Sequence, residues 1–245
     1  MKPAADKIAI AKQLQATINA MQGLGKLSSE PVPAGLYPFA TAFPGNVFPT
    51  GAIHEFISYE PADAASTTGF ITALTGKLMK EGGLCLWVGK NRNVFPGGLK
   101  HFGLAPDRLV FIHAPYSKDA LWIIEEALKC EALTAVISEL RELSFTDSRR
   151  LQLAMEKSGV TGLIHRHCPG RENAVACTTR WKVSALPSTA RDTLPGVGYP
   201  AWNVQLLKVR NGKPDSWQVC WSDESFVPLD DKHFTLPLTN KRQTG

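Results

Sequence analysis

Residues 133–166, LTAVISELRELSFTDSRRLQLAMEKSGVTGLIHR, contain the pattern that decides the fold. The stretches at 133–138 and 160–166 are predominantly apolar, which is typical of strands buried on both faces of a parallel sheet. Between them, residues 146–159 begin with Thr-Asp and end with Gly, and this combination of start and stop signals predicts a helix. The segment is therefore predicted to be a strand–helix–strand unit.

Working outward, the same alternation of apolar strands and helices continues toward the amino terminus. Strands are predicted at 52–58, 82–89 and 107–113, and helices at 66–80, with Ser66 as its cap, and 118–130. This pattern indicates an α/β fold with a mostly parallel central sheet flanked by helices.

The carboxyl-terminal third has a different pattern. Polar and apolar residues alternate at 177–188, 202–209 and 216–222, and Asn211-Gly212 is a turn signal between the last two. Residues 202–222 are therefore predicted to form a hairpin, so the sheet ends antiparallel.

The two ends of the chain differ from this core. Residues 4–21 have the spacing of an amphipathic helix, and residues 22–50 are rich in Pro and Gly but contain several large apolar side chains that predict packing on the core. These packing candidates are Leu36, Tyr37, Phe39, Phe43, Val47 and Phe48. We expect a helix and arm at 1–47, a core at 48–222, and a polar tail at 223–245 that frays.

Composition narrows the class of protein. The chain has 245 residues, 44% of them hydrophobic and 20% charged, which suits a globular protein with a sizeable core. No apolar run is long enough to span a membrane, and the five cysteines are scattered without a CxxC pair, so a cytoplasmic protein without disulfides is expected. The net charge of +5 permits a nucleic-acid or acidic protein partner.

A phosphate-binding loop is missing from the position where this fold would place one. Such a loop has the pattern GxxxxGK[ST], but the segment here, SYEPADAASTTGF at 58–70, has no glycine before Gly69 and no lysine. Ser66, Thr67 and Thr68 offer hydroxyls at the predicted helix start and are read mainly as caps, with a weakened nucleotide site as the alternative. Glu139, at the end of the apolar strand LTAVISEL, could hold a metal or activate water, but a single acidic residue at a strand end is more often solvated or salt-bridged.

Other catalytic or metal patterns are weak. The run His-Arg-His-Cys at 165–168 alternates between the two faces of a strand, and the chain has no second ligand pair and no GxSxG nucleophile elbow. We therefore expect no metal, no cofactor and no catalytic residues.

Residues 166–182 form a more suggestive basic segment. It contains Arg166, Arg171, Arg180 and Lys182 against Glu172 as its one acid, with Pro169-Gly170 predicting a flexible loop. Basic side chains on a loop at a sheet edge suit a phosphate backbone or an acidic protein surface. These four residues are the candidate DNA or partner contacts.

The order of these elements resembles the RecA core. The strands that carry the resemblance are GAIHEFIS (51–58), LCLWVGK (84–90), ALTAVISE (132–139), VTGLIHR (160–166) and NAVACTTRWKV (173–183). Within that superfamily the chain is similar to the ImuA family of RecA-like mutagenesis accessory proteins. This second resemblance rests on LYPFATAFPGNVFPTGAIHE (36–55), LSFTDSRRLQLAMEKSGVTGLIHR (143–166), TRWKVSALPS (179–188) and WNVQLLKVRNGKPDSWQVCW (202–221).

The resemblance implies a non-catalytic adaptor in damage-induced translesion synthesis. Its partners would be an ImuB-like pseudo-polymerase, RecA and an error-prone replicative-type polymerase, with weak DNA binding and a nucleoid-associated location in the cytoplasm. The position of the phosphate-loop lysine falls near Ala64 or Ala65, that of the catalytic glutamate near Lys90, and Glu139 keeps an acid where the magnesium-linked aspartate belongs. A protonated lysine cannot act as a general base, so ATP hydrolysis is not expected.

Two alternatives remain open at this stage. SulA, a related RecA-like remnant, blocks FtsZ assembly during cell division, although SulA proteins are shorter and the long amino-terminal arm and closing hairpin here favour ImuA. A surviving nucleotide-binding ATPase is the other alternative.

Overall fold

The computed structural model describes residues 36–90, 94–189 and 198–229. The helix predicted at 4–21 and the basic end of the tail lie outside these residues. The strands form one nine-stranded sheet in the order β3-β2-β4-β5-β1-β6-β7-β8-β9. Their bounds are β1 Ile53–Ser58, β2 Leu84–Gly89, β3 Leu109–His113, β4 Leu133–Leu140, β5 Thr161–His167, β6 Thr179–Thr189, β7 Tyr199–Val209, β8 Asp215–Ser222 and β9 Ser225–Pro228.

The sheet is parallel from β3 through β6 and antiparallel from β6 through β9. This confirms the predicted α/β class, with a mostly parallel sheet, flanking helices and a closing antiparallel hairpin. Asn211, in the hairpin turn, has a positive φ of 57°, a conformation that asparagine tolerates better than most residues.

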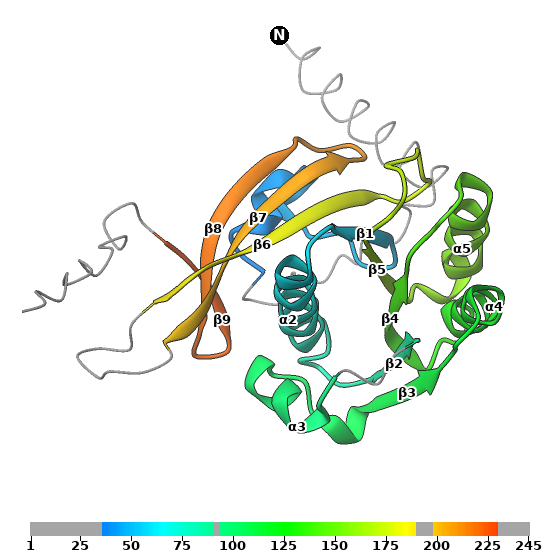
Figure 1. Ribbon diagram of the computed structural model, residues 1–245, viewed down its shortest axis with the longest axis horizontal. Coiled ribbons are helices and arrows are strands. Elements are labelled where there is room, and N and C mark those ends of the chain that lie inside the picture. Colours follow the sequence, from blue (N-terminus) through cyan, green and yellow to red (C-terminus); the bar gives the residue numbers. More distant parts are fainter. Residues whose placement is uncertain (1–35, 91–93, 190–197, 230–245) are drawn as a thin grey trace, which may run out of the picture.

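Helices cover both faces of the sheet, which curves around α2 and carries α4 and α5 on its outer face (Figure 1). The α-helices are α2 Pro61–Leu78, α3 Pro96–Leu99, α4 Ser117–Leu128 and α5 Phe145–Ser158, and short 3₁₀ turns lie at Phe39–Ala42, Pro44–Asn46, Lys100–Phe102 and Pro106–Arg108. Helix α5 starts where the Ser144 hydroxyl accepts a hydrogen bond from the Asp147 amide, and it ends at Gly159, whose φ is 73°. None of the described helices is long and apolar enough to cross a membrane.

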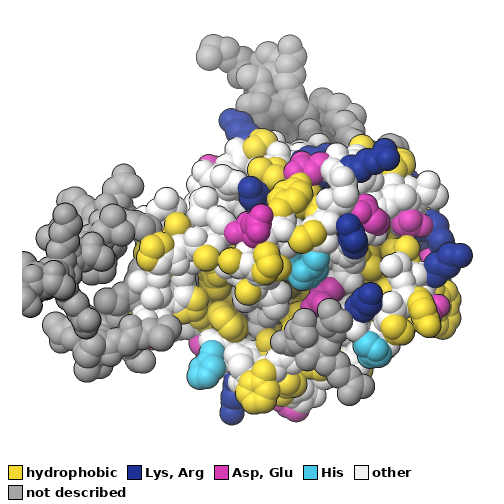
Figure 2. Space-filling view, in the orientation of Figure 1, with side chains coloured by type: hydrophobic (Ala, Val, Ile, Leu, Met, Phe, Trp, Pro, Cys, Tyr) yellow, Lys and Arg dark blue, Asp and Glu magenta, His cyan; other side chains and the backbone are white. Residues whose placement is uncertain are grey.

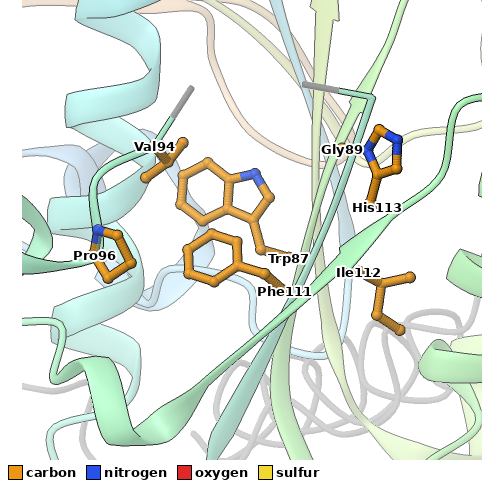
Figure 3. Close-up of a pocket in the computed structure, with 7 residues that line it drawn as sticks. All are labelled: Trp87, Gly89, Val94, Pro96, Phe111, Ile112 and His113. Atoms are coloured by element: carbon orange, nitrogen blue, oxygen red, sulfur yellow. The ribbon is translucent and has the colours of Figure 1, made fainter. Parts of the chain in front are cut away.

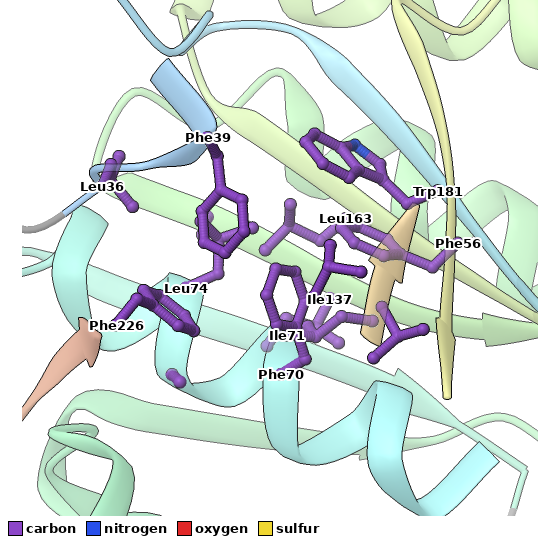
Figure 4. Packing of buried hydrophobic residues seen from close by; sticks show 14 of the residues in the cluster. Leu36, Phe39, Phe56, Phe70, Ile71, Leu74, Ile137, Leu163, Trp181 and Phe226 are labelled. Atoms are coloured by element: carbon purple, nitrogen blue, oxygen red, sulfur yellow. The ribbon is translucent and has the colours of Figure 1, made fainter. Parts of the chain in front are cut away.

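The core on the α2 face is built from aromatic rings contributed by both ends of the described chain (Figure 4). Phe39 makes edge contacts with Phe70 and Phe226, with ring centroids 5.3 and 5.0 Å apart, and Trp181 stacks on Phe56. The Pro/Gly-rich arm therefore packs on the core, as predicted for Leu36, Phe39, Phe43 and Phe48. Tyr37 is the exception, because its side chain is exposed. The predicted fraying is wrong for 225–228, which form β9 and bury Phe226.

A buried histidine links this arm to the sheet. The His54 ring stacks on Phe48, its Nε2 lies 2.9 Å from the Pro49 carbonyl oxygen, and its Nδ1 lies 2.7 Å from the Thr179 hydroxyl. A carbonyl only accepts, so Nε2 carries the proton, and Nδ1 accepts from Thr179, which in turn accepts from the Trp181 indole N–H. Burial lowers the pKa of His54 to about 4, so the ring is neutral at pH 7.

Candidate functional site

The connection between β1 and α2 is only two residues long, Tyr59 and Glu60. Helix α2 begins directly at Pro61, whose fixed φ suits the first turn of a helix. A phosphate loop needs several backbone N–H groups that wrap around the anion, and it needs positive charge nearby. The short connection and the carboxylate of Glu60 provide neither.

The three hydroxyl residues predicted at the helix start lie inside α2 instead, which corrects the prediction. Ser66 and Thr67 donate to the backbone carbonyls of Ala62 and Asp63, at 2.9 and 2.7 Å. Thr68 lies on the same helix and faces a cavity. Sequence reasoning placed the start five residues too late because Ser66 is a good cap, whereas proline at the first turn set the actual start.

Glu139 lies near the end of β4, as predicted, on the same face of the sheet as α2. Its Oε1 accepts a hydrogen bond of 3.1 Å from the Trp87 indole nitrogen, and burial raises its pKa. No lysine or arginine within the described chain forms a salt bridge with it. Glu139 is thus a partly desolvated carboxylate with one oxygen already used.

Two histidines of β5 lie beside it. His165 Nε2 is 2.8 Å from the buried Ser58 hydroxyl, and the His165 and His167 rings lie 3.8 Å apart between centroids. His167 Nε2 is buried without a hydrogen-bond partner. Burial lowers the pKa of both histidines, so both are neutral at pH 7. Within the described ranges, no three His, Cys, Asp or Glu side chains converge as a metal site would require.

Glu139 and His167 form the floor of a groove between α2 and the segment that contains α3. We name it the α2–α3 groove; its volume is about 670 Å³. Its lining residues are Glu60, Pro61, Ala64, Ala65, Thr68, Gly69, Thr72, Val94, Phe95, Gly98, Leu99, Phe102, Glu139, His167 and Cys168. Apart from the carboxylates and histidine, most of these side chains are small or apolar.

A second, smaller cavity of about 320 Å³ lies next to it, toward β3. Figure 3 shows the Trp87 and Phe111 rings side by side, with Val94 and Pro96 across the cavity. Trp87 therefore lines this cavity with its ring while its indole N–H reaches the floor of the α2–α3 groove.

The basic segment differs from its prediction because two of its four cations are committed to one buried acid. Arg166 is fully buried, and its Nη1 lies 2.8 Å from Glu55 Oε1. Arg180 Nε lies 2.6 Å from Glu55 Oε2, and its side chain is 13% exposed. The prediction of Arg166 as a surface contact is wrong, since parallel β1 lies beside β5 and Glu55 neutralises it.

The same network fixes the loop that sequence reasoning predicted to be flexible. Arg166 Nη2 donates to the Arg171 carbonyl at 3.2 Å, and Arg180 Nη2 donates to the Asn173 carbonyl at 2.6 Å. Arg171 is exposed, and the Lys182 ammonium lies over the Tyr59 ring, 5.9 Å from its centroid. Among the four candidates, Arg171 and Lys182 remain available for contact.

Glu55, the buried partner of these two arginines, is the residue of this network that the sequence did not reveal. The signal was a single acid inside a short strand predicted to be buried, because a buried carboxylate needs a cation as its partner. Its partners could not be assigned without the strand order, because Arg166 and Arg180 are more than a hundred residues away in sequence.

Together these features define an α/β protein with a mostly parallel sheet and no phosphate cradle at its first strand–helix connection. No family model matches the chain. It is 32% identical over 187 residues to Protein ImuA of Caulobacter vibrioides, in strain NA1000 / CB15N and in strain ATCC 19089 / CIP 103742 / CB 15. The match covers 71% of this chain and 77% of each relative. The chain belongs to the ImuA family, and at the level of the family it has a role in the mutagenesis and translesion system.

Proposed function

We propose that this protein is a non-catalytic adaptor in translesion synthesis that binds an ImuB-like pseudo-polymerase, with RecA and an error-prone replicative-type polymerase as further partners. The observation that carries the non-catalytic part is the two-residue connection from β1 to α2. Family membership supports the setting in translesion synthesis.

The charges around the carboxyl edge of the parallel strands support the same conclusion. Lys90 is exposed directly after β2, at the position expected for a catalytic glutamate. Glu139 and Glu60 line the groove at this edge, and their carboxylates would repel a triphosphate bound there. The residues that remain suit binding to a protein better than hydrolysis of a nucleotide.

Weak, salt-sensitive DNA binding is the second part of the proposal, and Arg171 and Lys182 carry it. Figure 2 shows Lys and Arg interspersed with Asp and Glu over the visible face rather than gathered in one block. Two accessible cations give a small electrostatic contribution, so DNA contact assists a protein complex rather than replacing it.

Co-expression with the cognate ImuB-like pseudo-polymerase tests the adaptor proposal. The tagged full chain should co-purify with that partner in a defined stoichiometry, while a catalytically active Y-family polymerase from the same genome serves as the specificity control. Failure to co-purify across a series of salt concentrations would overturn the proposal.

Calorimetry with ATP and Mg²⁺ tests the non-catalytic part. We expect no binding tighter than about 100 μM. A tighter complex would reopen the nucleotide site. A light-scattering assay of FtsZ polymerisation separates the adaptor from the SulA-like alternative, because stoichiometric adaptor should leave polymerisation unchanged.

A further inference from the structure

The α2–α3 groove has the size of a binding site and no established occupant. Its volume of about 670 Å³ lies within the range of sites that hold drug-sized molecules, about 300–1,000 Å³. One rim carries Phe95, whose side chain is 77% exposed, and the opposite wall is formed by small residues such as Ala65 and Gly69. An exposed aromatic rim over a shallow apolar wall is suited to cover a flat ring.

The charge of the described lining disfavours anions. Among the residues that the structure describes, the groove is lined by Glu60 and Glu139 and by no lysine or arginine. A phosphate-bearing ligand would face these two carboxylates, which is unfavourable. The suitable occupant is neutral or basic.

The floor of the groove can accept a hydrogen bond from an occupant. Glu139 uses Oε1 to accept from Trp87, and no hydrogen bond within the described residues occupies Oε2. A carboxylate that is partly buried gains more from an N–H or O–H donor than an exposed one does. The His167 side chain lies on the same floor, and its Nε2 is buried without a hydrogen-bond partner, so Glu139 Oε2 is the acceptor through which an occupant can be bound.

The protein's own undescribed segments contain neither tryptophan nor tyrosine. The aromatic side chains of residues 1–35, 91–93, 190–197 and 230–245 are His233 and Phe234, and of these two only His233 has an N–H. A tryptophan or tyrosine ring in the groove would therefore come from another molecule.

We propose that the α2–α3 groove binds a tryptophan or tyrosine side chain of a partner protein, with the ring between α2 and Phe95 and its N–H or O–H donating to Glu139. The inference rests on the proposed function in that it makes the occupant part of a protein partner. The groove's own selectivity is tested without any partner.

The first experiment titrates the ¹⁵N-labelled full chain with N-acetyltryptophanamide and with N-acetylphenylalaninamide, a control probe that has the same amide groups but no donor on its ring. The Trp87 indole N–H signal should shift with the first probe, while the indole signal of the remote, exposed Trp122 stays. Tryptophanamide should bind about tenfold more tightly, as one hydrogen bond to a charged group predicts. Glu139→Gln, which keeps the shape of the side chain, should reduce that preference.

Several outcomes would overturn the inference. They are equal binding of the two probes, a Trp87 signal that does not move, or shifts confined to other surfaces. Tighter binding of adenosine than of tryptophanamide would assign the groove to a nucleoside instead.

The second experiment asks whether the partner uses the groove. Ala65→Trp fills it, and Ala62→Trp places the same side chain on the exposed part of the same helix outside the groove. The pseudo-polymerase should co-purify with Ala62→Trp and at least tenfold less with Ala65→Trp.

If both variants retain the partner, the adaptor proposal stands and the groove inference falls. If the unmodified chain fails to co-purify, the adaptor proposal falls, and the probe titration still decides the groove's chemistry. Loss of self-association in Ala65→Trp alone would assign the groove to a second copy of this chain and overturn the partner assignment.

Discussion

Replacing Glu55 by glutamine should destabilise the protein far more than a surface Glu→Gln change would. Glu55 is fully buried and is the close acidic partner of two cations, Arg166 at 2.8 Å and Arg180 at 2.6 Å. Glutamine keeps the size of the side chain but removes the charge, which leaves the buried Arg166 guanidinium with Glu142 at 3.5 Å and backbone carbonyls.

The expected magnitude follows from breaking a buried ion pair on one side, which costs about 3–5 kcal/mol. For a protein of this size each kcal/mol shifts the melting temperature by about 2–4 °C, so a fall of roughly 6–20 °C is expected. The loop that contains Arg171 should also become more susceptible to trypsin, because the arginines that fix it lose their anchor.

Urea unfolding followed by tryptophan fluorescence measures the change in the free energy of unfolding. The matched control is Glu126→Gln, since Glu126 is exposed and pairs with Lys129 on the surface of α4, where no measurable change is expected. A Glu55→Gln protein within about 1 kcal/mol of its parent would refute the reasoning, because it would show that the network is not desolvated.

Three further outcomes are expected. The free energy of unfolding should rise with pH between about 4 and 6.5, by up to about 3 kcal/mol from His54 alone. The reason is that the unfolded histidine binds a proton in that window and the folded one does not. Urea unfolding of His54→Gln should show a shallower pH dependence, and an unchanged slope would contradict the assignment. Arg171→Glu combined with Lys182→Glu should weaken DNA binding and reduce the slope of log affinity against log salt by about 2; fluorescence anisotropy that shows an unaltered slope would remove both residues from the interface. Gly76→Ala should lower the free energy of unfolding by about 1–3 kcal/mol, although alanine has the better helix propensity, because the new Cβ would lie 2.4 Å from the Phe102 carbonyl oxygen. A more stable variant would show that α2 and the turn containing Phe102 separate easily.

The sequence predicted the parts of the fold that depend on local pattern. Apolar runs located the parallel strands, and Asn211-Gly212 located the hairpin turn, because buried strands and positive-φ turns have local signatures. The start of α2 was predicted five residues late, since Ser66 and Pro61 are both plausible first-turn residues and only packing distinguishes them. The four-residue β9 had no detectable periodicity.

The candidate site was predicted less well, for a physical reason. The absence of a phosphate loop could be predicted from the sequence, because such a loop depends on residue types at fixed spacing. The burial of Arg166 could not be predicted, because it depends on which strand lies next to β5. A basic residue at a strand end suggests a surface, and only the neighbouring Glu55 on β1 converts it into part of the core.

The contact between Phe39 and Phe226 has a consequence for synthesis of the chain. These two rings lie near opposite ends of the described residues and meet in the same aromatic core, 5.0 Å apart between centroids. During translation Phe39 emerges from the ribosome before Phe226, the ring that completes its environment. Helices α4 and α5 on the outer face are encoded between the two rings and are free to pack earlier. The two faces of the sheet should therefore form one after the other, with the α2 face closing only after β9 has emerged.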